Sequence, residues 1–177
     1  MKQLTEYPAR ICLTAGGILI HQNKVLLVKH KKLGIWLNPG GHLEKDELPH
    51  QNAEREFWEE TGVKVRAYDI NPLDSDDDSQ YVPSPISSNL HWVSQENFNQ
   101  RQAGNNKKEA KWKKGCEQHI GFIYLVKPIN GVEFHENVEE TDGIAWFTQQ
   151  EVRSLKETKD NVKTEVDLAF SLVDGTI

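Results

Sequence analysis

The chain has 177 residues, of which 37% are hydrophobic and 27% are charged, and its formal net charge is −6. This length and composition are typical of a globular protein with one hydrophobic core. An acidic chain has no general attraction for nucleic acid or for anionic membranes, so we expect neither as a stable partner. No apolar run approaches the roughly 20 residues of a membrane-spanning helix, and the N-terminal sequence lacks the long apolar core of a signal peptide.

The cysteine content is low: Cys12 and Cys116 are the only two. Two cysteines are too few for a disulfide framework and indicate a reducing compartment, so we expect a cytoplasmic protein. Cys116 and His119 have the spacing of half a zinc site, but no second pair follows, so a structural zinc ion is not expected.

The first part of the chain predicts strands followed by a helix. Residues 11–20 and 24–30 are apolar and β-branched, with turn-forming residues between them, which indicates a β-hairpin. Residues 32–44 read as a short strand that runs into a Pro-Gly-Gly turn. A helix is predicted from about Pro49 to Thr61, because proline favours a first turn and Gly62 stands just past the end. Residues 63–70 alternate and predict a further strand.

The second part contains two predicted loops, at about 74–88 (acidic and broken by prolines) and at about 99–115 (polar and basic). Strands are predicted near residue 90, over 118–128 and over 143–147. Thr148 and Glu151 form a capping box that predicts a helix start, and residues 162–173 have helical spacing. We therefore expect one domain over residues 1–177, of the α/β class with a mixed sheet.

The predicted helix at 49–61 carries glutamates in an unusual arrangement. On a helix with about 100° per residue, Glu59 lies about 60° to one side of Glu56 and Glu60 about 40° to the other. Three carboxylates on one face repel one another unless a cation lies among them. Hard cations such as Mg²⁺ take carboxylate oxygens and often bridge to substrate phosphates. A solvated acidic helix face is the alternative interpretation.

The residues around these glutamates carry a longer pattern. From Gly41, the sequence runs through five residues to Glu47 and seven more to Arg55-Glu56-Phe57, then to Glu59-Glu60 and Gly62-Val63. Every position of the Nudix box is present over residues 41–63, and the chain here resembles the Nudix hydrolase family. The flanking segments 14–20, 23–30 and 35–44 also look like the family's first strands.

The resemblance implies an α/β/α sandwich with a central mixed sheet. It also implies an enzyme that uses Mg²⁺ (or Mn²⁺) to hydrolyse a pyrophosphate bond in a nucleoside diphosphate linked to another group. A bound metal would lower the pKa of a water molecule and neutralise charge on phosphate oxygens, and a nearby carboxylate could take the proton. The implied partner is a small nucleotide, and the protein would be a monomer or homodimer.

The resemblance also assigns roles to residues. Glu56, Glu59 and Glu60 would be metal ligands, one of them serving as base, together with the backbone carbonyl of Gly40. Arg55 would belong to the same catalytic group, chiefly by an ion pair with Glu47 that supports the helix face. Family members usually have a further acidic ligand outside the box; the candidates here are Glu117, Glu139 and Glu140.

Substrate choice is less defined. Candidate substrate-binding residues are Asn38 beside the Pro-Gly-Gly turn, Tyr81 in the acidic loop and His119 in the strand 118–128. Tyr81 falls where relatives that act on diadenosine polyphosphates carry a tyrosine. The basic cluster at 107–114 could meet phosphate or be a solvated loop. Trp36 is expected in the core.

Two other functions stay open. A non-catalytic Nudix module would bind a nucleotide without turnover, although such modules often lose box glutamates and this chain retains them. A prenyl diphosphate isomerase shares the fold, but it relies on an altered box and a dedicated cysteine, and Cys12 and Cys116 give that function little support.

Overall fold

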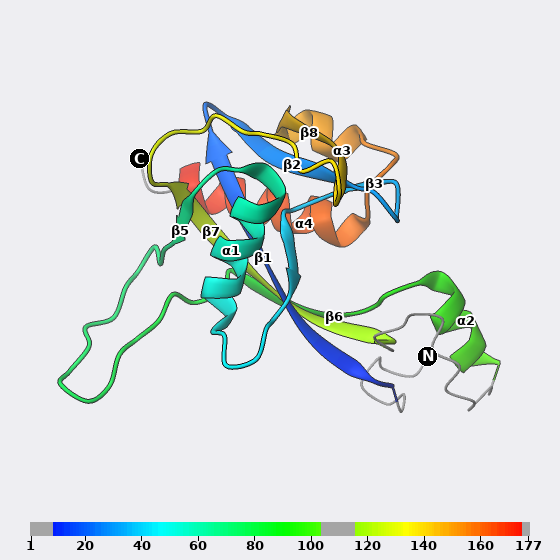
Figure 1. Cartoon of the computed structure of the whole chain (residues 1–177), viewed down its shortest axis with the longest axis horizontal. Helices are drawn as coiled ribbons and strands as arrows, with labels where there is room; N and C mark the ends of the chain where they lie inside the picture. Colours follow the sequence, from blue (N-terminus) through cyan, green and yellow to red (C-terminus); the bar gives the residue numbers. More distant parts are fainter. Residues whose placement is uncertain (1–8, 104–115, 175–177) are drawn as a thin grey trace.

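The computed structural model describes residues 9–103 and 116–174 and contains a mixed β-sheet between layers of helix (Figure 1). Within these residues the elements are, in chain order, β1 (Ile11–His21), β2 (Lys24–His30), β3 (Ile35–Leu37), β4 (Gly40–His42), α1 (Pro49–Thr61), β5 (Val65–Ala67), β6 (Ser87–Trp92), α2 (Gln95–Gln102), β7 (Gln118–Pro128), β8 (Thr141–Thr148), α3 (Gln149–Ser154) and α4 (Asp160–Asp174).

The long strands β1 and β7 form the centre of the sheet. They pair in parallel from Ile11 opposite Gln118 to Leu19 opposite Val126. The main order is β3-β2-β1-β7-β5, while β4 pairs with β1, β6 with β7 and β8 with β2. All pairings other than β1 with β7 are antiparallel. The predicted mixed sheet is therefore confirmed.

The predicted hairpin at the N-terminal end is also confirmed. Gln22 and Asn23 form its turn, both with positive φ (48° and 58°), and His21 pairs with Lys24. Two central residues with positive φ define a turn whose twist matches that of the flanking strands. Asparagine tolerates this backbone region better than most residues, which explains its position in the turn.

Helix α1 begins and ends where the sequence predicts. Proline starts it, and Gly62 ends it in the left-handed region (φ 73°), donating its N–H to Trp58 O at 2.7 Å. The helix buries Ala53 and Phe57 completely against one face of the sheet. Burying a phenylalanine side chain contributes about 1.5–3 kcal/mol, so this contact fixes the helix on the sheet.

The opposite face of the sheet packs against α3 and α4. Val152, Val162, Val166 and Phe170 join a second core cluster there. The capping box at the start of α3 is confirmed: Glu151 N–H donates to Thr148 Oγ1 at 3.2 Å and Thr148 N–H to Glu151 Oε2 at 2.7 Å. Trp36 packs against this cluster, edge-on to Phe147, as expected for a core residue. The layers are thus helix, sheet and helix (Figure 1).

The two predicted loops need adjustment. Residues 74–86 have no regular structure and project away from the sheet (Figure 1), but β6 already begins at Ser87. The beginning of the basic loop is helical, because α2 extends to Gln102. The lysine cluster at 107–114 lies outside the described residues. Among the described residues, no helix is both long and apolar enough to span a membrane.

Candidate active site

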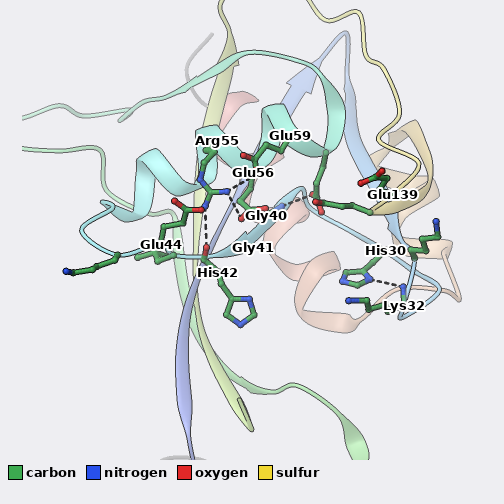
Figure 2. Close-up of a pocket in the computed structure, with 15 residues that line it drawn as sticks. His30, Lys32, Gly40, Gly41, His42, Glu44, Arg55, Glu56, Glu59 and Glu139 are labelled. Carbon is green, nitrogen blue, oxygen red and sulfur yellow. Dashed lines mark hydrogen bonds and ion pairs between the residues drawn. The ribbon is translucent and has the colours of Figure 1, made fainter. Parts of the chain in front are cut away.

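The carboxylates of α1 line a groove of about 710 Å³ at one edge of the sheet (Figure 2). We call it the acidic groove, and its lining residues are His30, Lys31, Lys32, residues 40–45, Arg55, Glu56, Glu59, Glu60, Glu139 and Glu140. Glu60 is buried, Glu56 is half-buried and Glu59 is exposed. The helical spacing therefore brings the three glutamates to one side, as the sequence predicts.

The glycines of β4 allow these carboxylates to approach the backbone. The N–H of Gly40 donates to Glu60 Oε2 at 3.0 Å. A Cβ atom at Gly41 would overlap the carboxyl group of Glu56. A side chain at position 41 would therefore fill the space that the Glu56 carboxylate occupies, which is the physical reason for glycine there.

Arg55 holds the face of carboxylates in place. Its Nε lies 2.8 Å from Glu47 Oε1 and its Nη2 3.0 Å from Glu47 Oε2, a two-point contact. Its Nη1 donates to Glu56 Oε1 at 2.9 Å and to Glu59 Oε2 at 2.8 Å. The expected pair with Glu47 is present, and the same guanidinium also orients two of the proposed ligands (Figure 2). The hydrogen bond from Arg55 lowers the pKa of Glu47 to about 2.

Asn52 is a positioning residue that the sequence reading missed. It is completely buried; its Oδ1 accepts from Ala15 N–H at 3.1 Å, and its Nδ2 donates to His42 O at 2.8 Å and to Glu47 Oε2 at 3.0 Å. It therefore ties α1 to β1 and β4. The sequence feature that could have identified Asn52 is its place next to Ala53, on the side of the helix that faces the core.

The electrostatics of the groove favour a cation. The pKa of Glu60 is raised to about 8, first by burial and then by the neighbouring Glu56, Glu140 and Glu59, while the hydrogen bond from Gly40 opposes the shift. Burial also raises the pKa of Glu56. Oxygen donors crowded in this way suit a hard divalent ion, which would replace mutual repulsion by attraction. The residues present therefore fit the metal that the box implies.

The opposite wall of the groove comes from the segment before β8 and from the β2–β3 turn. Asn137 Nδ2 donates to Glu59 O at 3.2 Å, which links this segment to the end of α1. Glu139 and Glu140 thereby line the groove, as two of the candidate ligands outside the box. Lys31 and Lys32 were not singled out from the sequence; the exposed Lys31 donates to Val138 O at 2.7 Å. These lysines add positive charge at the rim.

The remaining candidates separate into two groups. Glu117 is not among the residues that line the acidic groove; its carboxylate accepts from Arg10 N–H at 3.0 Å. Tyr81 is 57% exposed in the loop before β6 and lines neither the groove nor the cavity beside it. Asn38 and His119 line that cavity, which shares Gly40, Gly41 and His42 with the groove.

The cysteines correct an expectation. Cys12 and Cys116 form a disulfide, although the low cysteine count predicted reduced thiols. The parallel pairing of β1 with β7 brings them together, because Cys12 lies opposite His119 in the register and Cys116 lies two positions before the first residue of β7. Cys116 Sγ also lies 3.6 Å from His42 Nε2, so the disulfide is next to the strand that forms the groove.

Comparison with known proteins identifies the family. The family model described as "NUDIX domain" matches residues 11–167. This chain belongs to the Nudix family. It is a Nudix hydrolase, and members of this family generally use divalent metal ions.

Individual relatives cover different shares of this Nudix chain. A "MutT-like protein" of Streptomyces ambofaciens is 33% identical over 151 residues, which are 85% of this chain and 72% of that protein. "Phosphatase NudJ" of Escherichia coli strain K12 is 38% identical over only 56 residues, 30% of this chain and 37% of that protein. The crystal structure of a NUDIX-family hydrolase from Clostridium perfringens has a TM-score of 0.64 at 24% identity, covering 89% of this chain and 97% of that one, which shows the fold.

Proposed function

We propose that this Nudix hydrolase cleaves a pyrophosphate bond in a nucleoside diphosphate linked to another group, with Mg²⁺ (or Mn²⁺) as cofactor. The observation that carries the proposal is that Glu60 and Glu56 lie against the backbone of Gly40 and Gly41, and that Glu59 lines the same groove. The family match and the MutT-like relative support the class of reaction.

In this proposal Glu56, Glu59, Glu60 and the Gly40 carbonyl hold the cation, and Glu139 or Glu140 adds a ligand from the facing segment. A bound divalent ion neutralises charge on phosphate oxygens and makes a water molecule more acidic. Lys31 and Lys32 attract the polyphosphate to the rim, Arg55 keeps Glu56 and Glu59 oriented, and one glutamate of the cluster accepts the proton of the attacking water.

The alternatives are weaker on the same observations. A non-catalytic module has no need for three acidic ligands of the box, all of which are retained. An isomerase with a dedicated cysteine needs a free thiol, and both cysteines of this chain are paired. Disulfides are rare in reducing compartments, so the cytoplasmic location stays a prediction.

The test is a turnover panel with Mg²⁺ and with Mn²⁺. It covers nucleoside triphosphates, ADP-ribose, nucleotide sugars, dinucleoside polyphosphates and coenzyme A. We expect metal-dependent release of a nucleoside monophosphate from at least one class, with Glu60→Gln inactive. The matched control is Glu54→Gln on the same helix, because Glu54 accepts from Ala67 N–H at 2.9 Å outside the groove and a glutamine oxygen can keep that bond.

Full activity of Glu60→Gln would contradict the proposal. Nucleotide binding by calorimetry, with no turnover of any compound in either metal, would instead support the non-catalytic module.

A further inference from the structure

A second cavity of about 210 Å³ adjoins the acidic groove on the side of the sheet that α4 covers. We call it the amide chamber; its polar lining includes Asn38, Asn89, His91, His119, Lys159 and Glu165, together with Thr14, His30, His42 and Asn161. It shares His30, Gly40, Gly41 and His42 with the groove. In Figure 2 the ring of His42 extends away from Arg55 and the glutamates. A ligand with phosphates in the groove can therefore reach the chamber with its other end.

Glu165 organises this chamber. Its side chain projects from α4 and is only 5% exposed. Asn38 Nδ2 donates to Glu165 Oε2 at 3.3 Å, and Asn89 Nδ2 donates to Glu165 Oε1. A carboxylate can only accept hydrogen bonds, so it turns the N–H groups of both asparagines toward itself. The oxygens of both asparagines consequently point elsewhere.

The two asparagine oxygens differ in their hydrogen bonding. Asn89 Oδ1 meets His91 Nδ1 at 2.6 Å. Asn38 Oδ1 is buried and has no hydrogen-bond partner within the described part of the chain, and the same holds for His119 Nε2. Burial lowers the pKa of His91 and of His119 to about 4, so both rings are neutral at pH 7. Buried polar atoms are nearly always paired, so these atoms suggest a ligand.

The walls and size define the shape of that ligand. Leu37, Ile123 and Val162 supply apolar surface in the same chamber. The volume is below the roughly 300–1,000 Å³ of a site for a drug-sized ligand, which suits one flat heterocycle with the remaining groups outside. A carboxylate has about four lone-pair sites, so Glu165 can accept from a ligand in addition to Asn38 and Asn89. Glu165 and Asn38 Oδ1 therefore favour a ligand with N–H donors on its edge. Lys159 supplies a donor for a carbonyl oxygen.

Among common bases, guanine has this combination. Its edge carries a carbonyl oxygen, a ring N–H and an amino group in sequence, whereas adenine has an amino group beside a ring acceptor and no carbonyl. Hypoxanthine differs from guanine only by lacking the amino group. We propose that the amide chamber binds the base of the substrate and that Glu165 and Asn38 select guanine through its two adjacent N–H donors. This inference rests on the proposed function for the groove.

The test is equilibrium binding of GMP, IMP and AMP, which contain no pyrophosphate bond, measured by calorimetry at pH 8 with Mg²⁺. Burial raises the pKa of Glu165 to about 7, so its carboxylate is largely ionised at this pH. We expect the wild type to bind GMP on the order of tenfold more tightly than IMP, since one hydrogen bond to a charged acceptor separates the two ligands. AMP should bind more weakly still.

Glu165→Gln should remove the preference for GMP over IMP, and Asn38→Ala should reduce it. Asp167→Asn is the matched control on α4, because Asp167 binds Arg153 and Gln149 outside the chamber. It should keep the full preference. Thermal unfolding shows whether each variant is folded. If Glu165→Gln does not fold, Asn38→Ala tests the preference for GMP independently.

Equal binding of GMP, IMP and AMP by the wild type would overturn the inference, as would an unchanged preference in a folded Glu165→Gln. Glu60→Gln separates the base preference from catalysis, because this variant lacks a proposed metal ligand but retains every residue of the chamber. It should keep the preference for GMP. A preference for GMP without pyrophosphate turnover would refute the proposed function alone; turnover without a base preference would refute the chamber proposal alone.

Discussion

The backbone N–H of Gly40 donates to the carboxylate of Glu60 across 3.0 Å, and this bond joins β4 to the last turn of α1. This neutral donor faces a carboxyl group whose neighbours Glu56, Glu59 and Glu140 are acidic. The consequence is a folded protein that contains electrostatic repulsion which a cation can relieve.

The metal-free protein should therefore lose stability as the pH rises. The pKa of Glu60 is raised from 4.5 to about 8 in the folded state, mainly by burial. The folded state then holds more protons than the unfolded state between these values, so the free energy of unfolding falls across that window by up to about 1.4 kcal/mol per pH unit. Urea unfolding with EDTA from pH 5 to 8 measures it.

Glu60→Gln is the comparison for that experiment, because its amide does not titrate. It should show a smaller decrease over the same pH range, the residual slope including Glu165, whose pKa is also raised. Identical slopes in wild type and variant would show that Glu60 ionises normally.

Arg55→Ala should destabilise the fold by about 2–3 kcal/mol, because it leaves Glu47, Glu56 and Glu59 without their shared cation. The side chains of Arg55 and Glu47 are only 23% and 13% exposed, so solvent compensates little. Urea unfolding measures the change. The control is Arg66→Ala: Arg66 is 65% exposed and pairs with Glu54 at 3.4 Å, so its loss should change stability by less than about 0.5 kcal/mol. Equal effects of the two variants would contradict the proposed role of Arg55.

Reduction of the disulfide should lower the free energy of unfolding by about 2–5 kcal/mol, since it joins residues separated by 104 positions. Thiol labelling before and after treatment with a reductant, together with urea unfolding of both forms, provides the measurement. Cys116→Ser should unfold identically with and without reductant. Thiols that label fully without reductant would show that the bond is absent.

Local sequence signals predicted much of the fold. Pro49 and Gly62 mark the ends of α1 because proline fits a first helical turn and glycine adopts the left-handed conformation at its end. The capping box of Thr148 and Glu151 placed the start of α3 for a similar local reason. The three glutamates of the box could be assigned to one face because helical geometry alone determines it.

Contacts between distant segments could not be predicted in this way. The parallel pairing of β1 with β7 joins residues more than 100 positions apart, and no local pattern specifies it. The disulfide depends on that pairing. The hydrogen bonds that Asn38 and Asn89 donate to Glu165 likewise join three segments that only the tertiary fold brings together. For the same reason the sequence could not choose among Glu117, Glu139 and Glu140.

The central claim is that the carboxylates of α1 form a divalent cation site, and a calorimetric titration with Mn²⁺ at pH 7 tests it most directly. Because burial raises the pKa of Glu60 to about 8, metal binding should release protons, which appears as a dependence of the heat on the ionisation enthalpy of the buffer. Glu60→Gln should bind on the order of tenfold or more weakly and release fewer protons, while Glu54→Gln should match the wild type. Equal affinity and equal proton release in all three proteins would contradict the account.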